Sequence, residues 1–462
     1  MNNLPSTLIC SLRNQEGFNE EAFKAVHEQT GQVTSVRLNP KKIFNIQYSI
    51  FNPQLERVPW SSNGYYLPER PSFTLDPLFH AGAYYVQEAS SMFLEEALKQ
   101  SVDLSQPIKV LDLCAAPGGK STLIQSAISK ESLLVSNEVI KTRVNILAEN
   151  MTKWGAANVI VTNNDPKDFQ RLDNYFDVIV VDAPCSGSGL FRKDPAAIAE
   201  WSENNVQLCA QRQQRILADV EPALKEGGIL IYSTCSYSQS EDEEIADWLT
   251  GELKMEGIGL KIPDDWGIIE TASAKYNSPG YRFYPDKLKG EGFFIAVFKK
   301  GLAGIGEVKN KKSKQRKETT GPVTAKELLV LSPFIDPVDD LAFIRQRDDI
   351  LAIPANIADD LALIRSVLYI KKAGIKIGNI IRDELVPAHE LAVSGRISEA
   401  VVRFEVDKET ALQYLRREEI KIDTDRKGWA LITFQQLPLG WIKLLGNRIN
   451  NYYPAAWRIL NK

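Results

Sequence analysis

Two cysteines in this sequence have the surroundings of nucleophilic thiols. Cys185 follows Asp182-Ala-Pro and precedes Ser-Gly, and Cys235 lies between Ser233-Thr and Ser-Tyr. Each comes directly after a β-branched run and is flanked by small or turn-forming residues, as expected of a side chain that opens into a cleft. A thiolate is the reactive form of cysteine, and it adds readily to an electron-poor carbon.

Such a pair of thiols suits methylation of a pyrimidine at C5, a carbon that is barely nucleophilic by itself. Addition of a thiolate to C6 turns C5 into an enamine-like nucleophile that can take a methyl group, and a base must then remove the C5 proton before the thiol can leave. Asp182 could hydrogen-bond the amino edge of cytosine and protonate N3. The spacing does not tell which of Cys185 and Cys235 attacks.

The remaining cysteines favour no further chemistry. Of the five in the chain, Cys10, Cys114 and Cys209 are expected to behave as small hydrophobic side chains. The chain has no C-x-x-C pair, and its three histidines are widely dispersed. These features exclude a disulfide framework and a zinc site, and they predict reduced thiols in a cytoplasmic protein without a metal.

A glycine-rich loop follows the first β-branched run of the central region. Its residues are Cys114, Ala115, Ala116, Pro117, Gly118, Gly119 and Lys120. Two adjacent glycines let a ligand approach the backbone at the start of a helix. The loop is not a Walker P-loop, and G-x-G-x-x-G occurs nowhere in the chain, which removes the main support for a dehydrogenase.

Acidic residues end the neighbouring runs. Glu138 lies 26 positions after Asp112, where a carboxylate can hold a ribose diol, and Asp165 could accept from an adenine amino group. One such acid alone is usually a helix cap. Three in register beside a glycine-rich loop favour a nucleoside cofactor without a pyrophosphate, and S-adenosylmethionine is the obvious candidate.

Short apolar runs alternate with helical stretches between residues 80 and 300. The predicted strands span residues 108–114, 132–138, 158–165, 176–185, 227–236 and 292–300. Nearly continuous apolar strands alternating with helices predict a Rossmann-like α/β fold, in which helices cover both faces of a parallel sheet. Ligands bind at the carboxyl ends of such strands, which is where the polar residues above occur.

The length of 462 residues predicts about three domains. We expect a small N-terminal α+β subdomain over residues 1–78 and the Rossmann-like domain over residues 79–300. A basic, flexible linker is expected over 301–322 and a helical connector over 323–364. Short strands separated by glycine and proline predict a β-rich domain over 365–462.

The net charge of −4 hides an uneven distribution. Residues 365–462 carry +6, residues 301–364 carry −1 and residues 1–300 carry −9. The run 309–317 has six basic residues in nine. A basic C-terminal part is compatible with RNA as a partner. No apolar run approaches the ~20 residues of a membrane helix, and the N-terminus lacks the pattern of a signal peptide.

Three motifs together carry a resemblance to a known family. LDLCAAPGGKST, DAPCSGSGLFRKDP and YSTCSYSQSEDE, in this order, resemble the RNA (cytosine-5) methyltransferases of the NOL1/NOP2/sun family. SVRLNPKK, GAYYVQEASSM and RFYPDKLKGEGFFIAVF extend the resemblance. VPAHELA and LPLGWIKLLGNRINNYYPAAWRI resemble the PUA-like RNA-binding module, so the layout is similar to bacterial 16S rRNA methyltransferases over nearly the whole chain.

The resemblance implies specific roles. Cys235 would attack C6 and Cys185 would assist release of the methylated base. S-adenosylmethionine would be bound by residues 114–120 with Glu138, Asp165 and Asp182. The N-terminal subdomain and the PUA-like domain would bind RNA, and the protein would act as a monomer on 16S rRNA or the small ribosomal subunit. One departure is Asp286, which stands where many members have histidine.

Other interpretations remain open at this level. A tRNA or DNA cytosine methyltransferase would share the motifs, and a non-catalytic RNA-binding assembly factor could keep the fold. Ser240–Glu243 is expected to be a capping box that begins a helix. Arg192 and Lys193 are expected in solvent, with phosphate contact as the alternative. Lys120 either reaches a ligand or pairs with a strand-end acid.

Overall fold

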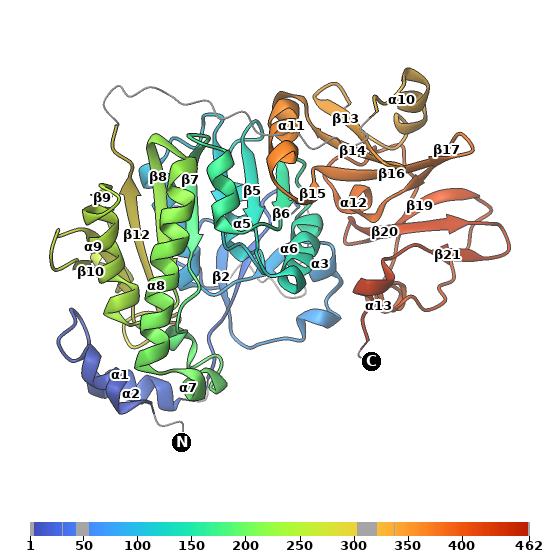
Figure 1. The fold of residues 1–462 in the computed structure, drawn as a ribbon. Helices are drawn as coiled ribbons and strands as arrows, with labels where there is room; N and C mark the ends of the chain where they lie inside the picture. Colours follow the sequence, from blue (N-terminus) through green and yellow to red (C-terminus); the bar gives the residue numbers. More distant parts are fainter. Residues whose placement is uncertain (1–3, 30, 43–54, 303–320, 337, 461–462) are drawn as a thin grey trace.

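The structure of the protein, a computed structural model, describes residues 4–29, 31–42, 55–302, 321–336 and 338–460. Its largest sheet has ten strands. They are β4 (Lys109–Asp112), β5 (Leu133–Asn137), β6 (Val159–Thr162), β7 (Phe176–Asp182), β8 (Leu224–Thr234), β9 (Glu256–Ile258), β10 (Ile269–Ala272), β11 (Pro279–Phe283), β12 (Phe293–Lys299) and β15 (Ile370–Ala373). They run in the order β10-β11-β12-β8-β7-β4-β5-β6-β15, with β9 paired to β12 (Figure 1).

The predicted parallel core of this sheet is confirmed. Strands β6, β5, β4, β7 and β8 are parallel neighbours, whereas β12 and β15 are antiparallel to the strands at the two ends of this core. The chain leaves β4 toward β6 and returns to β7, on the other side of β4. This reversal places a crevice outside the carboxyl ends of β4 and β7, the usual ligand position in such a fold.

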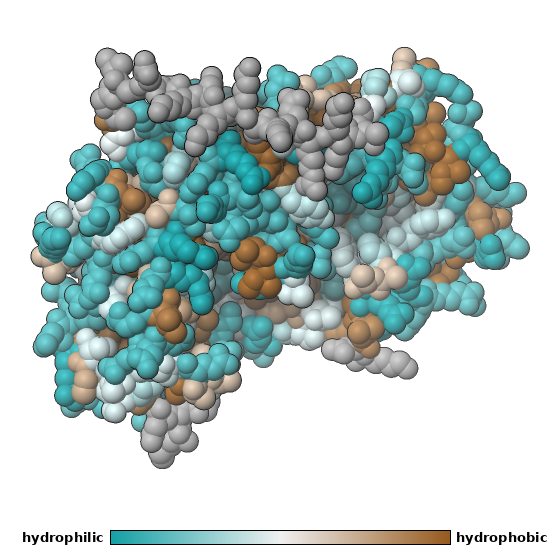
Figure 2. Space-filling view, in the orientation of Figure 1, coloured by the Kyte–Doolittle hydropathy of each residue, from teal (hydrophilic) through white to brown (hydrophobic). Residues whose placement is uncertain are grey.

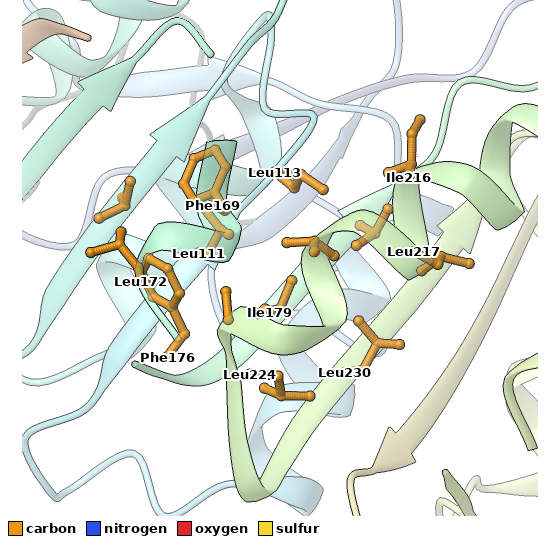
Figure 3. Packing of buried hydrophobic residues seen from close by; sticks show 14 of the residues in the cluster. Leu111, Leu113, Phe169, Leu172, Phe176, Ile179, Ile216, Leu217, Leu224 and Leu230 are labelled. Atoms are coloured by element: carbon orange, nitrogen blue, oxygen red, sulfur yellow. The ribbon is translucent and has the colours of Figure 1, made fainter. Parts of the chain in front are cut away.

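Helices cover both faces because the strand side chains alternate between two buried clusters. The helices of this domain are α4 (Leu94–Ser101), α5 (Gly119–Ala127), α6 (Lys141–Trp154), α7 (Ala196–Glu200), α8 (Glu203–Val220) and α9 (Glu243–Gly251). Leu111 of β4 and Ile179 of β7 pack with Leu217 of α8 on one face (Figure 3). Val110 and Val178, one position earlier on these strands, join a cluster with α4, α5 and α6 on the other face.

The N-terminal part forms a small sheet against this core. Its elements are α1 (Ser6–Leu12), α2 (Glu20–Glu28), β1 (Thr34–Leu38), β2 (Gly64–Leu67), α3 (Pro77–His80) and β3 (Tyr84–Val86). The sheet order is β2-β1-β3. Because β3 pairs with β1, this part extends past the boundary expected at residue 78. Helices α1 and α2 lie beside α7, where Phe23 shares a buried cluster with Trp201 (Figure 1).

The stretch 323–364, expected to be a helical connector, contains a β-hairpin. Between α10 (Ala325–Leu331) and α11 (Ala358–Val367) lie β13 (Leu341–Gln346) and β14 (Asp349–Pro354). The hairpin turns at Arg347, which has a φ of 57°. Its strands continue through β16 (Ile375–Ile381) and β17 (Glu384–Pro387) into a four-stranded sheet. Cross-strand pairing overrode the helical pattern, since these short segments can bury their apolar residues only in a sheet.

The β-rich C-terminal region is confirmed. Its elements are α12 (His389–Val393), β18 (Arg403–Glu405), α13 (Lys408–Arg416), β19 (Gly428–Phe434), β20 (Leu437–Leu444) and β21 (Ile449–Asn451). The sheet order is β18-β19-β20-β21.

Most of the linker expected over 301–322, including its basic run, lies outside the described residues. Within the described ranges, no helix has the length and apolar character to cross a membrane, and the face in Figure 2 is mainly hydrophilic with small hydrophobic patches.

Candidate active site

The ends of β7 and β8 bring the two predicted thiols into contact. The strands are parallel neighbours in which Asp182 lies opposite Ser233, so the loops that follow them run side by side. The sulfurs of Cys185 and Cys235 lie 2.9 Å apart. The hydrogen bond with Cys235, followed by burial, raises the pKa of the Cys185 thiol well above its ordinary value. Either sulfur can be the donor in this contact, and the raised pKa favours the protonated form of Cys185.

Asp182 lies beside this pair and is held from two sides. One carboxylate oxygen accepts from the Ser233 hydroxyl at 2.9 Å, and the other lies 2.8 Å from Nζ of Lys120. Although burial acts to lower it, the Asp182 carboxylate raises the pKa of Lys120. Of the two alternatives for Lys120, the structure shows the pairing with a strand-end acid.

The glycine-rich loop crosses the end of β4 and leads into α5. Gly118 stands at the start of this helix with a φ of +118°, a conformation that side chains rarely adopt, and a Cβ there would lie 3.3 Å from Leu147. The Ala116 carbonyl accepts from Arg143 at 2.7 Å, which ties the loop to α6. The loop backbone is thus fixed at a helix N-terminus, and Cys114 packs half-buried against the core.

The strand-end acids differ in their surroundings. Asp112 is buried; one of its oxygens accepts from Ser121 at 2.6 Å, and the other has no hydrogen-bond partner among the residues that the structure describes. Burial raises the pKa of Asp112 to about 7. Glu138 is also buried, accepts from the Ile140 amide at 2.9 Å and lies 3.6 Å from Arg143.

Asp165 is exposed and caps the following turn by accepting from the Lys167 amide at 3.1 Å. This is the ordinary role of such an acid. Together, the backbone cradle at Gly118, the open carboxylate oxygen of Asp112 and the acid at Glu138 fit a nucleoside with a charged amino acid chain. These residues would hold S-adenosylmethionine.

The run Ser240–Glu243 is not the capping box that its pattern predicts. Helix α9 begins at Glu243, and the Ser240 hydroxyl accepts from Gln207 at 3.2 Å. Glu241, Asp242 and Glu243 are all buried. A buried carboxylate needs charged or hydrogen-bonding partners, and the surrounding loops supply them.

Arg282 of β11 is the partner of two of these acids. Its Nε and Nη2 donate to the two oxygens of Glu243 at 2.6 and 2.5 Å, and Nη2 lies 3.1 Å from Asp242. Nη1 donates to the carbonyl of Tyr237 at 3.0 Å, just past the second thiol loop. Sequence reasoning missed this cluster; three consecutive acids directly after the cysteine loop were the available signal.

Of the two basic residues after the first thiol loop, Arg192 differs from expectation and Lys193 does not. The Arg192 side chain is only 6% exposed, donates to the Gly290 carbonyl at 3.3 Å and lies 3.9 Å from Glu291, so it is not solvated. Lys193 is exposed, as predicted. Asp286, at the departure from the family pattern, is half-buried and lies 3.9 Å from Lys287. Burial raises its pKa.

This sheet, with a glycine-rich loop and acids at the ends of parallel strands, defines the class of S-adenosylmethionine-dependent methyltransferases. Three family models match the chain: "16S rRNA methyltransferase RsmB/F" over residues 100–299, "N-terminal domain of 16S rRNA methyltransferase RsmF" over 4–89, and "Methyltransferase RsmF PUA domain" over 401–459. Among the described residues, no group of side chains is arranged to hold a metal.

Relatives of known name agree over most of the chain. Ribosomal RNA small subunit methyltransferase F of Shewanella loihica is 30% identical over 437 residues, which covers 91% of this chain and 88% of that protein. The Cronobacter sakazakii protein of the same name is 30% identical, with coverages of 91% and 89%. The chain therefore belongs to the RsmF family and is an S-adenosylmethionine-dependent RNA methyltransferase.

Solved structures show the same fold in the catalytic part. A methyltransferase homolog from Pyrococcus horikoshii has a TM-score of 0.51 and 28% identity, and the match covers 64% of this chain and 100% of that one. NSun6 from Pyrococcus horikoshii, solved with SFG, has a TM-score of 0.51 and 20% identity, with coverages of 64% and 98%. SFG is an analogue of S-adenosylmethionine.

Proposed function

We propose that the protein forms 5-methylcytosine in 16S rRNA, with Cys235 as the nucleophile and Cys185 as the residue that assists release. The observation that carries this proposal is the 2.9 Å contact between the two sulfurs, beside the Asp182–Lys120 pair. A single reactive thiol would explain attack on the base. Two thiols in contact supply both attack and release within one site.

The residues divide the reaction between them. The Cys235 sulfur bonds to C6 of cytosine, and the electron pair displaced to C5 takes the methyl group. When bound, S-adenosylmethionine would supply this methyl group as an electrophile, with S-adenosylhomocysteine as the leaving group. A base then takes the C5 proton, the C5–C6 double bond re-forms, and the C6–S bond breaks with its electron pair returning to Cys235. In its protonated form, Asp182 would donate to N3 of the ring and accept from the amino group.

The contact between the sulfurs supports this order of events. A Cys185 thiol that donates toward Cys235 stabilises the thiolate there, which favours Cys235 as the attacking group. Once Cys235 is bonded to C6, the hydrogen bond that raises the pKa of Cys185 is lost. Cys185 can then give its proton to solvent and take the C5 proton as the base.

The target cytidine must be unpaired or flipped out of its stack, because C6 is inaccessible within a helix. The C-terminal region with its charge of +6 would hold the RNA through phosphate and shape contacts. We further propose that the protein works as a monomer in the cytoplasm, where its five free cysteines stay reduced.

Methylation assays with thiol variants test this function. Purified protein is incubated with 16S rRNA or small subunits and labelled cofactor, and 5-methylcytosine is mapped. Cys235→Ala is expected to abolish turnover, and Cys185→Ala to accumulate a covalent protein–RNA adduct that migrates slowly on a denaturing gel. Cys10→Ala, which alters an exposed cysteine, is the control and should retain activity.

Several outcomes would contradict the proposal. Wild-type protein that labels no RNA would exclude the enzymatic function, and full activity in Cys235→Ala would exclude it as the nucleophile. A Cys185→Ala reaction without the slow species would exclude the release role. Bisulfite sequencing of total RNA from cells with and without the gene distinguishes a 16S rRNA target from a tRNA target.

A further inference from the structure

Glu241 contacts both loops that carry the thiols, and the proposed reaction does not use it. The residue ends the 3-10 turn Gln239–Glu241 that precedes α9, and it is 0% exposed. Burial raises the pKa of its carboxyl group. An acid so placed costs free energy unless its oxygens are satisfied, so its partners indicate why it is there.

The partners of Glu241 come from both thiol loops. Ser186, which follows Cys185, donates its amide to Oε1 at 2.7 Å and its hydroxyl to Oε2 at 2.6 Å. Ser236, which follows Cys235, donates its hydroxyl to the same Oε2 at 2.6 Å. One carboxylate therefore joins the residue after one thiol to the residue after the other, through short charge-assisted hydrogen bonds.

Glu241 is itself held firmly by the core. Its backbone carbonyl accepts from the Tyr232 hydroxyl at 2.6 Å. Gln213 of α8 lies 3.5 Å from Oε1 and donates to the Pro184 carbonyl at 3.1 Å, next to Cys185. The position of the carboxylate is therefore set by β8 and α8, and both thiol loops are hydrogen-bonded to this fixed group.

We propose that Glu241 is a positioning residue that sets the separation of the Cys185 and Cys235 sulfurs and thereby the rate at which the methylated base is released. The inference rests on the proposed function, because it assumes that both thiols act in one catalytic cycle. Proton removal from C5 requires the base within hydrogen-bond reach of the adduct that the other thiol holds. If the shared carboxylate is lost, the loops keep the bonds from the Gly189 amide to the Cys235 carbonyl and from the Tyr237 amide to the Ser188 hydroxyl. The separation of the sulfurs is then less tightly set, and release suffers more than attack.

Charge supports the same role. After the hydrogen bond to Cys235 and burial, the negative charges at Cys235 and Glu241 also raise the pKa of Cys185. Glu241 thus helps to keep Cys185 protonated in the free enzyme. A neutral residue at 241 removes this contribution to the pKa of Cys185.

The kinetic test uses Glu241→Gln, which keeps the shape but replaces one acceptor oxygen by a donor. We expect turnover to fall at least about tenfold and the covalent RNA adduct to accumulate, because release depends on the placement of Cys185. The KM for RNA and the affinity for S-adenosylmethionine should not change. Glu244→Gln is the matched control, since Glu244 lies three residues further along, on α9, and is exposed.

A second measurement reads the thiol separation without any reaction on RNA. Diamide oxidises two adjacent thiols to a disulfide and is itself reduced to the hydrazine, and mass spectrometry of non-reduced peptides follows the Cys185–Cys235 cross-link. Wild type and Glu244→Gln should cross-link at the same rate, and Glu241→Gln at least about fivefold more slowly. Ser236→Ala, which removes one donor to Glu241 and the acceptor of the Ser238 amide, gives an intermediate rate should Glu241→Gln fail to fold.

The outcomes separate this inference from the proposed function. Cross-linking of a folded Glu241→Gln at the wild-type rate overturns the positioning role. The same follows if the variant loses turnover without accumulating adduct while its cofactor affinity falls in parallel. If wild type methylates no RNA but Glu241→Gln still slows the cross-link, the proposed function fails and the role of Glu241 in setting the separation stands.

Discussion

Cys185 and Cys235 are chemically identical side chains that their surroundings make different. The hydrogen bond between the two sulfurs and burial raise the pKa of Cys185, which favours its protonated form. Because the sulfurs are in contact, a change in the state of one thiol alters the surroundings of the other. A single substitution near the two cysteines can therefore change the properties of both thiols while leaving both cysteines in place.

The buried carboxyl group of Asp112 gives a prediction at the scale of one residue. Burial raises its pKa to about 7, whereas an unfolded chain titrates the same group near a pKa of about 4. Between these values the folded protein holds the extra proton, so Asp112 makes the unfolding free energy fall as pH rises from about 4 to about 7. Asp112→Asn should flatten this decline in urea unfolding measured from about pH 5 to about pH 8 without cofactor.

The control for this measurement is Asp165→Asn, which changes an exposed acid after strand β6 of the same sheet. It should leave the pH dependence of stability as in the wild type. An Asp112→Asn curve that still falls with the wild-type slope would show that other buried acids, such as Glu291 with a pKa raised by burial to about 7, account for the decline.

At the scale of elements, the site depends on the close approach of the loop after β7, the loop after β8 and the start of β12. The loop after β7 meets the start of β12, where the Gly292 amide donates to the Gly189 carbonyl at 3.1 Å. The Gly189 amide in turn donates to the Cys235 carbonyl at 2.9 Å. Strand β12, far along the chain, thus supports both thiol loops through backbone contacts that leave no room for a side chain.

Gly292→Ala tests this approach. A Cβ at this position would lie 2.3 Å from the Tyr237 ring and 2.5 Å from Cα of Gly189, so the backbone must shift. We expect turnover to fall more than about tenfold, with loss of about 1–3 kcal/mol in urea unfolding from overpacking. Gly395→Ala is the control, since its Cβ would meet open space. Equal activity of the two variants would contradict this account.

At the scale of the whole molecule, Lys42 connects three parts of the chain. Its Nζ donates to the carbonyls of Ala81, Lys153 and Val393 at 2.7, 2.6 and 2.7 Å. These acceptors belong to the N-terminal part, to α6 of the methyltransferase domain and to α12 of the C-terminal region. Strand β15 adds a second connection by pairing with β6. These contacts hold the C-terminal region in a defined position relative to the methyltransferase domain.

Lys42→Met should loosen this arrangement. It leaves three partly buried carbonyls without their donor, which we expect to cost about 2–3 kcal/mol in urea unfolding. Limited proteolysis should then cut between the parts sooner than in the wild type. Lys41→Met, at the exposed neighbouring position, should change neither result. Unaltered stability of Lys42→Met would show that β15 pairing alone holds the parts together.

Sequence patterns predicted much of the fold because local composition determines buried parallel strands. The β-branched runs ending at Asp112, Asp182 and Thr234 were identified correctly, and so was the edge at which polar residues gather. The hairpin β13–β14 was missed, since short apolar segments of this kind are ambiguous until a partner strand is present. The run Ser240–Glu243 was misread for the same reason. A capping pattern is local, whereas Arg282, the partner of Asp242 and Glu243, is distant in sequence.

The sequence by itself determined the class of enzyme, and it predicted the strand ends at which the cofactor would bind and the two cysteines. Each of these depends on residue types within a few positions of one another. Only the tertiary structure decided that the sulfurs touch, that Lys120 pairs with Asp182 and that Glu241 joins the two thiol loops. Such contacts arise where separate strands and loops pack together, and spacing along the chain carries no information about them.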